Sequence, residues 1–260
     1  MKENPNTLSF LATMQFLTGI PVPLKRELTP EQLGKATAFF PLVGLVLGGI
    51  LAGLNWVFNL FLPSPVVNIL LIVSLVALTG AMHLDGFADT CDGMAGHKSV
   101  EERWKVMRDS RTGAFGVVGI ALLLITKYVA LDNVSANFMT AALIFVPVVS
   151  RWAMVYAIFA FRYARPQGLG TAYKNATQWT QFITATVLTL AIAGALYPLF
   201  HFAGFLLFAG ILIVATILGF YFRYKFAGQT GDTYGALNET SEVMALLFIV
   251  IIITVAPALL

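Results

Sequence analysis

Seven long apolar runs constrain this chain more than any other feature. A helix needs about 20 mostly apolar residues to cross the hydrocarbon core of a bilayer. Only 11% of the 260 residues are charged, against about 25% in soluble domains. The sequence therefore predicts an all-α, polytopic integral membrane protein, a single domain with about seven transmembrane helices. The expected spans are Ala36–Leu62, Pro65–Met82, Ala114–Leu131, Phe138–Phe161, Thr180–Phe200, Ala203–Phe222 and Ser241–Leu260.

A shorter apolar run, Thr7–Ile20, precedes these spans and ends at Pro21. It is too short for a confident span, so we expect a short N-terminal helix that is interfacial or half-inserted. The segment before it, Met1–Asn6, has no features of a cleaved signal peptide. Cys91 is the single cysteine and cannot form an internal disulfide.

The basic residues lie almost entirely on one side of the expected membrane. Seven spans alternate the connecting segments between two sides, and one side collects fourteen of the sixteen Lys and Arg residues, while the other carries only Asp132. Cytoplasmic loops are rich in Lys and Arg, so we expect the N-terminus and all four long loops to be cytoplasmic and Leu260 to lie outside. The fourteen residues are Lys2, Lys25, Arg26, Lys35, Lys98, Arg103, Lys105, Arg108, Arg111, Arg162, Arg165, Lys174, Arg223 and Lys225.

An acidic segment on the same side, residues 83–93, carries the strongest chemical signal. Asp85, Asp89 and Asp92 are spaced i, i+4, i+7, which places them on one stripe of a helix. Three such carboxylates repel one another unless a cation joins them, and Mg²⁺ binds through carboxylates and substrate phosphates. The alternative is a solvated acidic helix end. Beside the stripe, His83 would bind substrate, act as a base, or form an interfacial hydrogen bond.

A second segment, at the start of the third span, contains Asp109, Ser110 and Arg111 followed by a glycine-rich stretch. Arginine gives bidentate hydrogen bonds to phosphate, so this segment is a candidate phosphate site. Arg111 could equally be a basic anchor at a helix start.

A third segment, expected as a loop from Gly228 to Glu239, is rich in glycine and small hydroxyl residues. It could supply backbone amides to a phosphate or a further metal ligand. A tight turn capped by Asp232 is the alternative. Its candidate binding residues are Gly228, Gln229, Thr230, Gly231 and Asp232.

Two basic residues fall within the expected spans. Arg151 is deep in its span, where a charge is costly and usually faces a polar cavity or pairs with a buried acid; binding of phosphate and pairing with an aspartate both stay open. Lys127 is nearer the outer end, and we expect it to extend toward Asp132 as a structural residue.

Several other classes of site have no support in the sequence. No His and Cys residues have zinc-site spacing, and neither a Walker-type phosphate loop nor a serine nucleophile elbow is present. Basic residues are not interleaved with exposed aromatic ones, so nucleic acid is not an expected partner.

Three motifs together closely resemble the cobalamin synthase (adenosylcobinamide-GDP ribazoletransferase) family: the acidic segment, Met107–Gly113 and Gly228–Thr233. Phe16–Pro23, Phe40–Gly44, Ser150-Arg151 and Arg165–Gly170 are similar to that family as well. The resemblance covers almost the whole chain. Phe87 departs from the family pattern, which has Leu there, without an evident catalytic consequence.

The resemblance implies a Mg²⁺-dependent transferase of the last step of coenzyme B12 synthesis, in the cytoplasmic (inner) membrane of a bacterium or archaeon. Adenosylcobinamide-GDP would react with α-ribazole or its 5′-phosphate, and GMP would leave. Asp85, Asp89 and Asp92 would hold the metal, with Arg111 stabilising developing charge and Arg151 and Arg165 binding substrate. A homo-oligomer, or contacts with other late enzymes of the pathway, stay open.

Two other functions compete with this one. A CDP-alcohol phosphotransferase of phospholipid synthesis also carries spaced aspartates on membrane helices, but its signature has arginine where this chain has Asp89, and its aspartates are spaced more widely. An ion-coupled transporter would place its acidic residues in the middle of the membrane, whereas these lie at a loop boundary.

Overall fold

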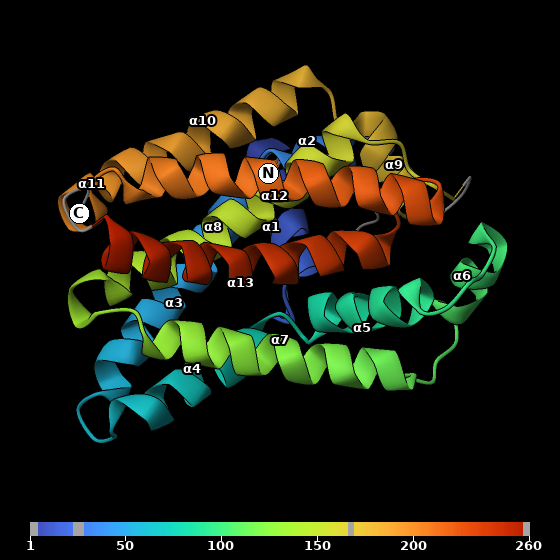
Figure 1. Cartoon of the computed structure of the whole chain (residues 1–260). Helices are drawn as coiled ribbons and strands as arrows, with labels where there is room; N and C mark the ends of the chain where they lie inside the picture. The colour runs from blue at the N-terminus through green and yellow to red at the C-terminus, as the bar shows by residue number, and fades with distance from the viewer. Residues whose placement is uncertain (1–4, 23–28, 166–168, 257–260) are drawn as a thin grey trace.

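The structure is a computed structural model of the chain, and it describes residues 5–22, 29–165 and 169–256. The described part is a bundle of helices (Figure 1) without β-strands; a single isolated bridge joins Tyr163 and Gln229. The helices are α1 (Pro5–Leu17), α2 (Pro30–Thr37), α3 (Phe40–Phe58), α4 (Ser64–Leu78), α5 (Met82–Met94), α6 (Val100–Val106), α7 (Ala114–Asp132), α8 (Ala136–Ala160), α9 (Leu169–Ala176), α10 (Trp179–Ala195), α11 (Tyr197–Phe200), α12 (Ala203–Phe226) and α13 (Gly231–Val255).

The expected all-α polytopic membrane architecture is confirmed. Five described helices, α3, α7, α8, α12 and α13, are long and apolar enough to cross a membrane, and α4 and α5 together form a sixth candidate that is bent by 89°. The bend lies at Gly80 and Ala81, between the two helices, and both residues have positive φ. The expected span Pro65–Met82 corresponds to α4 alone, and α5 lies in a segment that was expected as a loop. The expected span Thr180–Phe200 corresponds to α10, which has only 17 residues and is a shorter apolar helix.

The expected loop from Gly228 to Glu239 is wrong for most of its length. Helix α13 begins at Gly231, because Thr230 and Thr233 form a capping box at its N-terminus. The cap is Thr230 rather than Asp232, which lies in the first helical turn. The seventh expected span therefore starts about three turns before Ser241, and the third motif is a helix start.

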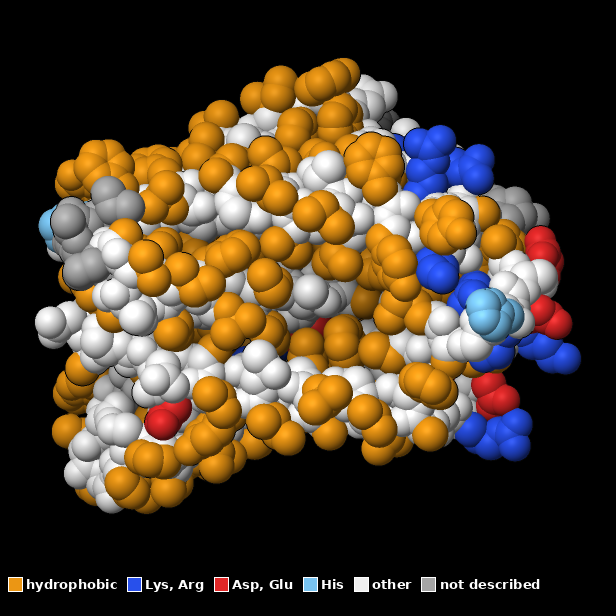
Figure 2. Space-filling view, in the orientation of Figure 1, with side chains coloured by type: hydrophobic (Ala, Val, Ile, Leu, Met, Phe, Trp, Pro, Cys, Tyr) orange, Lys and Arg blue, Asp and Glu red, His pale blue; other side chains and the backbone are white. Residues whose placement is uncertain are grey.

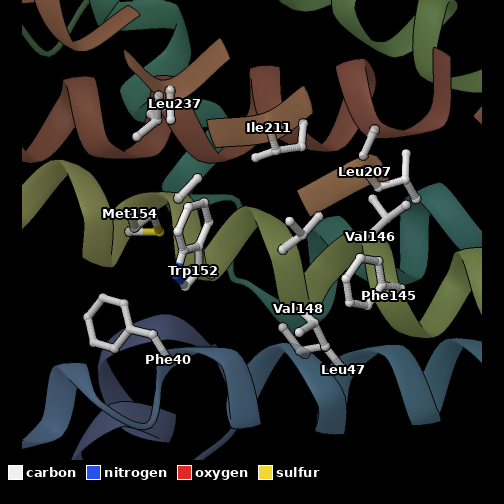
Figure 3. Packing of buried hydrophobic residues seen from close by; sticks show 14 of the residues in the cluster. Phe40, Leu47, Phe145, Val146, Val148, Trp152, Met154, Leu207, Ile211 and Leu237 are labelled. Atoms are coloured by element: carbon white, nitrogen blue, oxygen red, sulfur yellow. The ribbon is translucent and has the colours of Figure 1, made fainter. Parts of the chain in front are cut away.

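Helix α8 is the centre of the bundle and the most deeply buried span. Its apolar side chains pack between α3 on one side and α12 and α13 on the other (Figure 3). Close approach of α3 depends on Gly44 and Gly48, where an added Cβ would collide with the backbone of Pro147 and Ile144 of α8. Small residues four apart are typical of such membrane helix interfaces.

The surface has two distinct parts. Large apolar side chains such as Leu122 of α7, Val187 of α10 and Ile217 of α12 are exposed, as expected for side chains that face lipid. Charged side chains gather at the end of the bundle that contains α6 and α9 (Figures 1 and 2). Of the expected one-sided basic residues, Lys2, Lys25 and Arg26 lie outside the described residues, as does Leu260.

The expected short N-terminal helix is α1. Its Leu8, Ala12 and Leu17 are buried, and it packs against α2 and α3. It therefore forms part of the bundle, and its Phe16 reaches the cavity described below.

Candidate active site

Helix α5 carries the three aspartates, as the spacing predicts. Their exposure falls along the helix: Asp85 is exposed, Asp89 is half-buried and Asp92 is buried. The helix lies against the start of α13, where an added Cβ at Gly86 would collide with the backbone of Asp232. The glycine in the acidic motif is thus explained by close packing of two helices, which brings the carboxylate of Asp232 near the stripe.

A cavity of about 430 Å³ opens between α5 and the start of α13. Asp85, Arg108, Arg165 and Asp232 line it together with the buried His83. Its volume is within the range of small-ligand pockets. The cavity brings carboxylates from two helices together with two guanidinium groups, an arrangement suited to a metal-bound phosphate ester.

Two chain segments pair to bring the arginine and the fourth aspartate together. Ala164 N–H donates to Gln229 O at 2.7 Å, and Gln229 N–H donates to Arg162 O at 2.9 Å. This pairing places Arg165 beside α13, and its Nη2 donates to Asp232 Oδ2 at 3.0 Å. The ion pair holds the guanidinium at the cavity wall.

The remaining candidates of the third motif divide into two groups. Gln229 and Thr230 are fully buried; the amide of Gln229 bonds Gly219 O and the Thr233 hydroxyl, so both residues support the turn. Gly228, with φ of 152°, permits the turn itself, and an added Cβ there would collide with the backbone of Ala164. Gly231, by contrast, lines the cavity.

Asp92 has a structural task that the spacing did not predict. Its Oδ2 accepts from Gly113 N–H at 2.7 Å and its Oδ1 accepts from Gly116 N–H at 2.9 Å. The carboxylate thus caps the N-terminus of α7, where negative charge is favourable. An added Cβ at either glycine would collide with this carboxylate, which accounts for both glycines.

Replacing Asp92 by Asn is expected to destabilise the protein by about 1–3 kcal/mol, because the amide has one acceptor oxygen and leaves one of the two N–H groups unpaired. Thermal unfolding in detergent measures the effect, with Asp85→Asn, a change at the exposed end of the stripe, as the matched control. An Asp92→Asn protein as stable as the control would contradict the capping role.

Asp109, Ser110 and Arg111 lie apart from the cavity. Asp109 and Arg111 instead line a more open hollow of about 480 Å³, together with Lys98 and Asp92. Arg111 donates to both carboxylate oxygens of Asp109, at 3.0 and 2.8 Å, and these hydrogen bonds lower the pKa of Asp109 to about 2. The side chain of Arg111 is 86% exposed; the structure does not bring it to His83 or Asp85, and its catalytic role stays a prediction.

The carboxylates do not form a closed metal cage. Within the described ranges, no three His, Cys, Asp or Glu side chains are close enough together to hold a metal ion by themselves. Asp85 and Asp89 nevertheless lie one turn apart on α5, and the backbone of Asp232 packs against Gly86, which lies between them in the sequence. Such a set suits a metal that takes part of its ligands from a substrate.

A buried charge cluster of four residues lies deeper in the bundle: Lys127 of α7, Arg151 of α8, and Glu239 and Glu242 of α13. Lys127 Nζ lies 2.7 Å from a carboxylate oxygen of each glutamate, and Arg151 Nη1 pairs with Glu242 Oε1. All four are at most 6% exposed. The two positive and two negative charges neutralise one another, and this offsets the high free-energy cost of an isolated charge in a membrane.

Both predictions for the charges within spans need correction. Lys127 does not extend toward Asp132, which lies five residues later and hence roughly 140° around the helix; Asp132 instead accepts a hydrogen bond from Asn68 at 2.9 Å. Arg151 forms the buried ion pair that was one of its two alternatives, but with a glutamate. It is fully buried and is absent from the cavity wall, so the structure places it behind the cavity.

Comparison with known proteins shows the family of this chain. A family profile described as cobalamin-5-phosphate synthase matches residues 9–250. The chain belongs to this family. It is 40% identical to the adenosylcobinamide-GDP ribazoletransferase of Syntrophobacter fumaroxidans over 240 residues, covering 91% of this chain and 96% of the relative. It is 37% identical to the enzyme of the same name from Geotalea daltonii over 243 residues, covering 94% and 97%. No solved structure matches the chain.

Membership of the cobalamin-5-phosphate synthase family confirms the resemblance and the expected class, a transferase of cobalamin biosynthesis. The cavity also contains residues to which the sequence analysis gave no role. Arg108 and Phe16 lie in segments that resemble the family but were given no role, and the aromatic residues Tyr163, Tyr173 and Tyr234 lie outside those segments. Only the resemblance around Phe16 and Arg165 could have indicated that these distant segments meet.

Proposed function

We propose that the chain joins adenosylcobinamide-GDP to α-ribazole or its 5′-phosphate, with release of GMP, in a Mg²⁺-dependent reaction. The observation that carries the proposal is the cavity where Asp85 and Asp232 meet Arg108 and Arg165. A ribose hydroxyl attacks the phosphorus next to the cobinamide arm and gives its proton to water. The bond from that phosphorus to the bridging oxygen breaks, and GMP leaves with that oxygen. Such transfers depend on positioning and on neutralising charge.

The donor set at the cavity fits Mg²⁺ better than the expected stripe does. Mg²⁺ usually binds one or two carboxylates and completes its shell with water and substrate phosphate. Asp85 and Asp232, which line the cavity, would hold it together with Asp89, which lies one turn from Asp85 on α5. Both carboxylate oxygens of Asp92 instead accept hydrogen bonds at the start of α7. When bound, the ion would neutralise the diphosphate. The absence of a closed three-residue cage among the described residues agrees with a site that the substrate completes.

Two arginines are placed to hold the diphosphate. One Nη atom of Arg165 pairs with Asp232, and its buried Nε has no partner among the described residues. Part of the guanidinium group is therefore free to donate a hydrogen bond to a phosphate oxygen. Arg108 lines the same cavity and is exposed. Their positive charge would stabilise the charge that develops on the leaving phosphate. Phosphate binding by Arg151 has no support in this geometry.

Reconstitution of the purified protein with adenosylcobinamide-GDP, α-ribazole and Mg²⁺ tests the proposal. We expect GMP and a product whose mass corresponds to the joined substrates, and no product in the presence of a chelator. Replacement of α-ribazole by a diacylglycerol, and solute uptake into proteoliposomes, test the phospholipid-synthesis and transporter alternatives. Absence of the joined product with full Mg²⁺ would contradict the proposal.

The orientation in the membrane is part of the proposal: the charged end, with the cavity, faces the cytoplasm. Cysteines introduced at Glu101 and at His201, in a Cys91→Ser background, would test it, because both positions are exposed and lie at opposite ends of the bundle. An impermeant thiol reagent applied to intact cells should label His201→Cys only. Labelling of Glu101→Cys alone would reverse the orientation.

A further inference from the structure

The cavity has two chemically different parts. Two of its four charged residues, Asp85 and Arg108, are exposed, and the other two, Arg165 and Asp232, are partly buried. The part walled by buried residues is apolar and aromatic, with Met154, Tyr173 and Tyr234 each at most 5% exposed. A ligand that fits both parts has a flat apolar group inside and an anionic or metal-binding group outside.

The aromatic part offers stacking surfaces for a ring. Phe16 and Tyr173 have ring centroids 4.6 Å apart, and Tyr163 and Tyr234 lie 6.2 Å apart with an interplanar angle of 28°. All four line the cavity although they come from four separate segments. Aromatic side chains bind a flat base by stacking on its faces, worth about 1–3 kcal/mol per base.

His83 and Tyr234 add polar atoms to this apolar wall. Both nitrogens of His83 and the hydroxyl of Tyr234 are buried and have no hydrogen-bond partner among the described residues. His83 is 2% exposed. A buried polar group without a partner costs about 1–3 kcal/mol, and a neutral imidazole has one donor and one acceptor. A ligand with a single acceptor beside the imidazole would remove part of that cost.

The two substrates of the proposed reaction carry different heterocyclic bases, guanine and benzimidazole, and these require different hydrogen-bond partners in the cavity wall. Guanine carries several donors and acceptors along its edge, and the described lining contains no Asn or Gln; of its two carboxylates, Asp232 is paired with Arg165. The base of α-ribazole is a benzimidazole with two methyl groups and one free ring nitrogen. Burying guanine here would leave several groups unpaired, whereas the benzimidazole needs one donor.

We infer that the aromatic part of the cavity binds the benzimidazole ring of α-ribazole, with His83 donating a hydrogen bond to the free ring nitrogen. This inference rests on the proposed function. The ribose then points outward to the carboxylates of Asp85 and Asp232, where the diphosphate arrives. A cavity of about 430 Å³ cannot also enclose the corrin, which stays outside, so the nucleoside binds beneath the larger substrate.

The inference can be tested by calorimetric binding of α-ribazole to the detergent-purified full chain without Mg²⁺ or the cobinamide nucleotide. We expect α-ribazole to bind and guanosine not to displace it. An analogue with carbon in place of the free ring nitrogen should bind about tenfold more weakly, the loss expected for one hydrogen bond. In His83→Phe this difference should vanish, and in His83→Gln, which keeps a donor, part of it should return.

Comparing two ligands on one variant cancels any general damage to the fold. Displacement of α-ribazole by guanosine, or an unchanged tenfold preference in His83→Phe, would overturn the inference. Full turnover without binding of α-ribazole to the free protein would overturn it as well, and the proposed function would stand. Neither binding nor turnover would contradict both.

Discussion

Replacing Asp85 or Asp89 by Asn is expected to lower turnover by about 100-fold or more, the usual loss when one group that stabilises transition-state charge is removed. Asp85 lines the cavity, and Asp89 lies one turn further along α5 within electrostatic reach of Asp85 and Asp232. The substitution keeps the shape and removes the charge. GMP release at several Mg²⁺ concentrations measures the effect, and a higher Mg²⁺ requirement would accompany the loss.

The controls separate charge at the cavity from charge elsewhere. Asp109→Asn changes an exposed carboxylate in the neighbouring hollow, and Asp132→Asn changes one at the far end of α7. Both should keep most of the turnover, and melting temperatures of all four variants should stay close to that of the parent. Near-parental rates for Asp85→Asn and Asp89→Asn at low Mg²⁺ would show that the stripe does not bind metal.

Replacing Glu242 by Ala is expected to cost about 3–5 kcal/mol of stability, the usual effect of removing one partner of a buried ion pair. Glu242 contacts both cations of the buried charge cluster. Without it, Arg151 has no carboxylate partner and Lys127 keeps only Glu239. Thermal or denaturant unfolding in detergent measures the loss, and Glu101→Ala on the exposed surface of α6 serves as the control.

A balanced double change tests whether charge, rather than volume, causes the loss. Arg151→Met combined with Glu242→Met removes one charge of each sign and leaves Lys127 with Glu239. We expect this double variant to be more stable than the sum of its single changes implies, and Arg151→Lys to keep much of the turnover. Strictly additive losses would contradict a cluster held together by charge balance.

The sequence predicted the class of fold well because apolar length is a property of whole segments. Spacing also placed Asp85 and Asp89 on one helix face correctly. The spacing did not show that Asp92 has a different role from Asp85 and Asp89, because it does not indicate which backbone N–H groups a carboxylate contacts. The signal was in Gly113 and Gly116, whose missing Cβ atoms leave room for that carboxylate.

The errors at α13 and Lys127 have a common cause. The expected loop ended at Glu239 and the expected span began at Ser241, so the expected helix started about three turns too late. Residues at i and i+3 share a helix face, so the two acids Glu239 and Glu242 within one apolar run could have indicated a partner for the basic residues of α7 and α8. Choosing that partner required the packing of helices distant in the sequence, and this information is absent from local patterns.

The buried charge cluster has a consequence for how the protein enters the membrane. An acidic or basic residue at the centre of an isolated helix costs about 2.5–3.5 kcal/mol on insertion scales, and α13 brings two glutamates to the cluster. Helices α7 and α8 are synthesised before it, and each brings one basic residue. Helix α13 therefore completes the electrical neutrality that α7 and α8 lack. A chain that stops before α13 retains two unmatched cations in lipid, which would mark it for degradation.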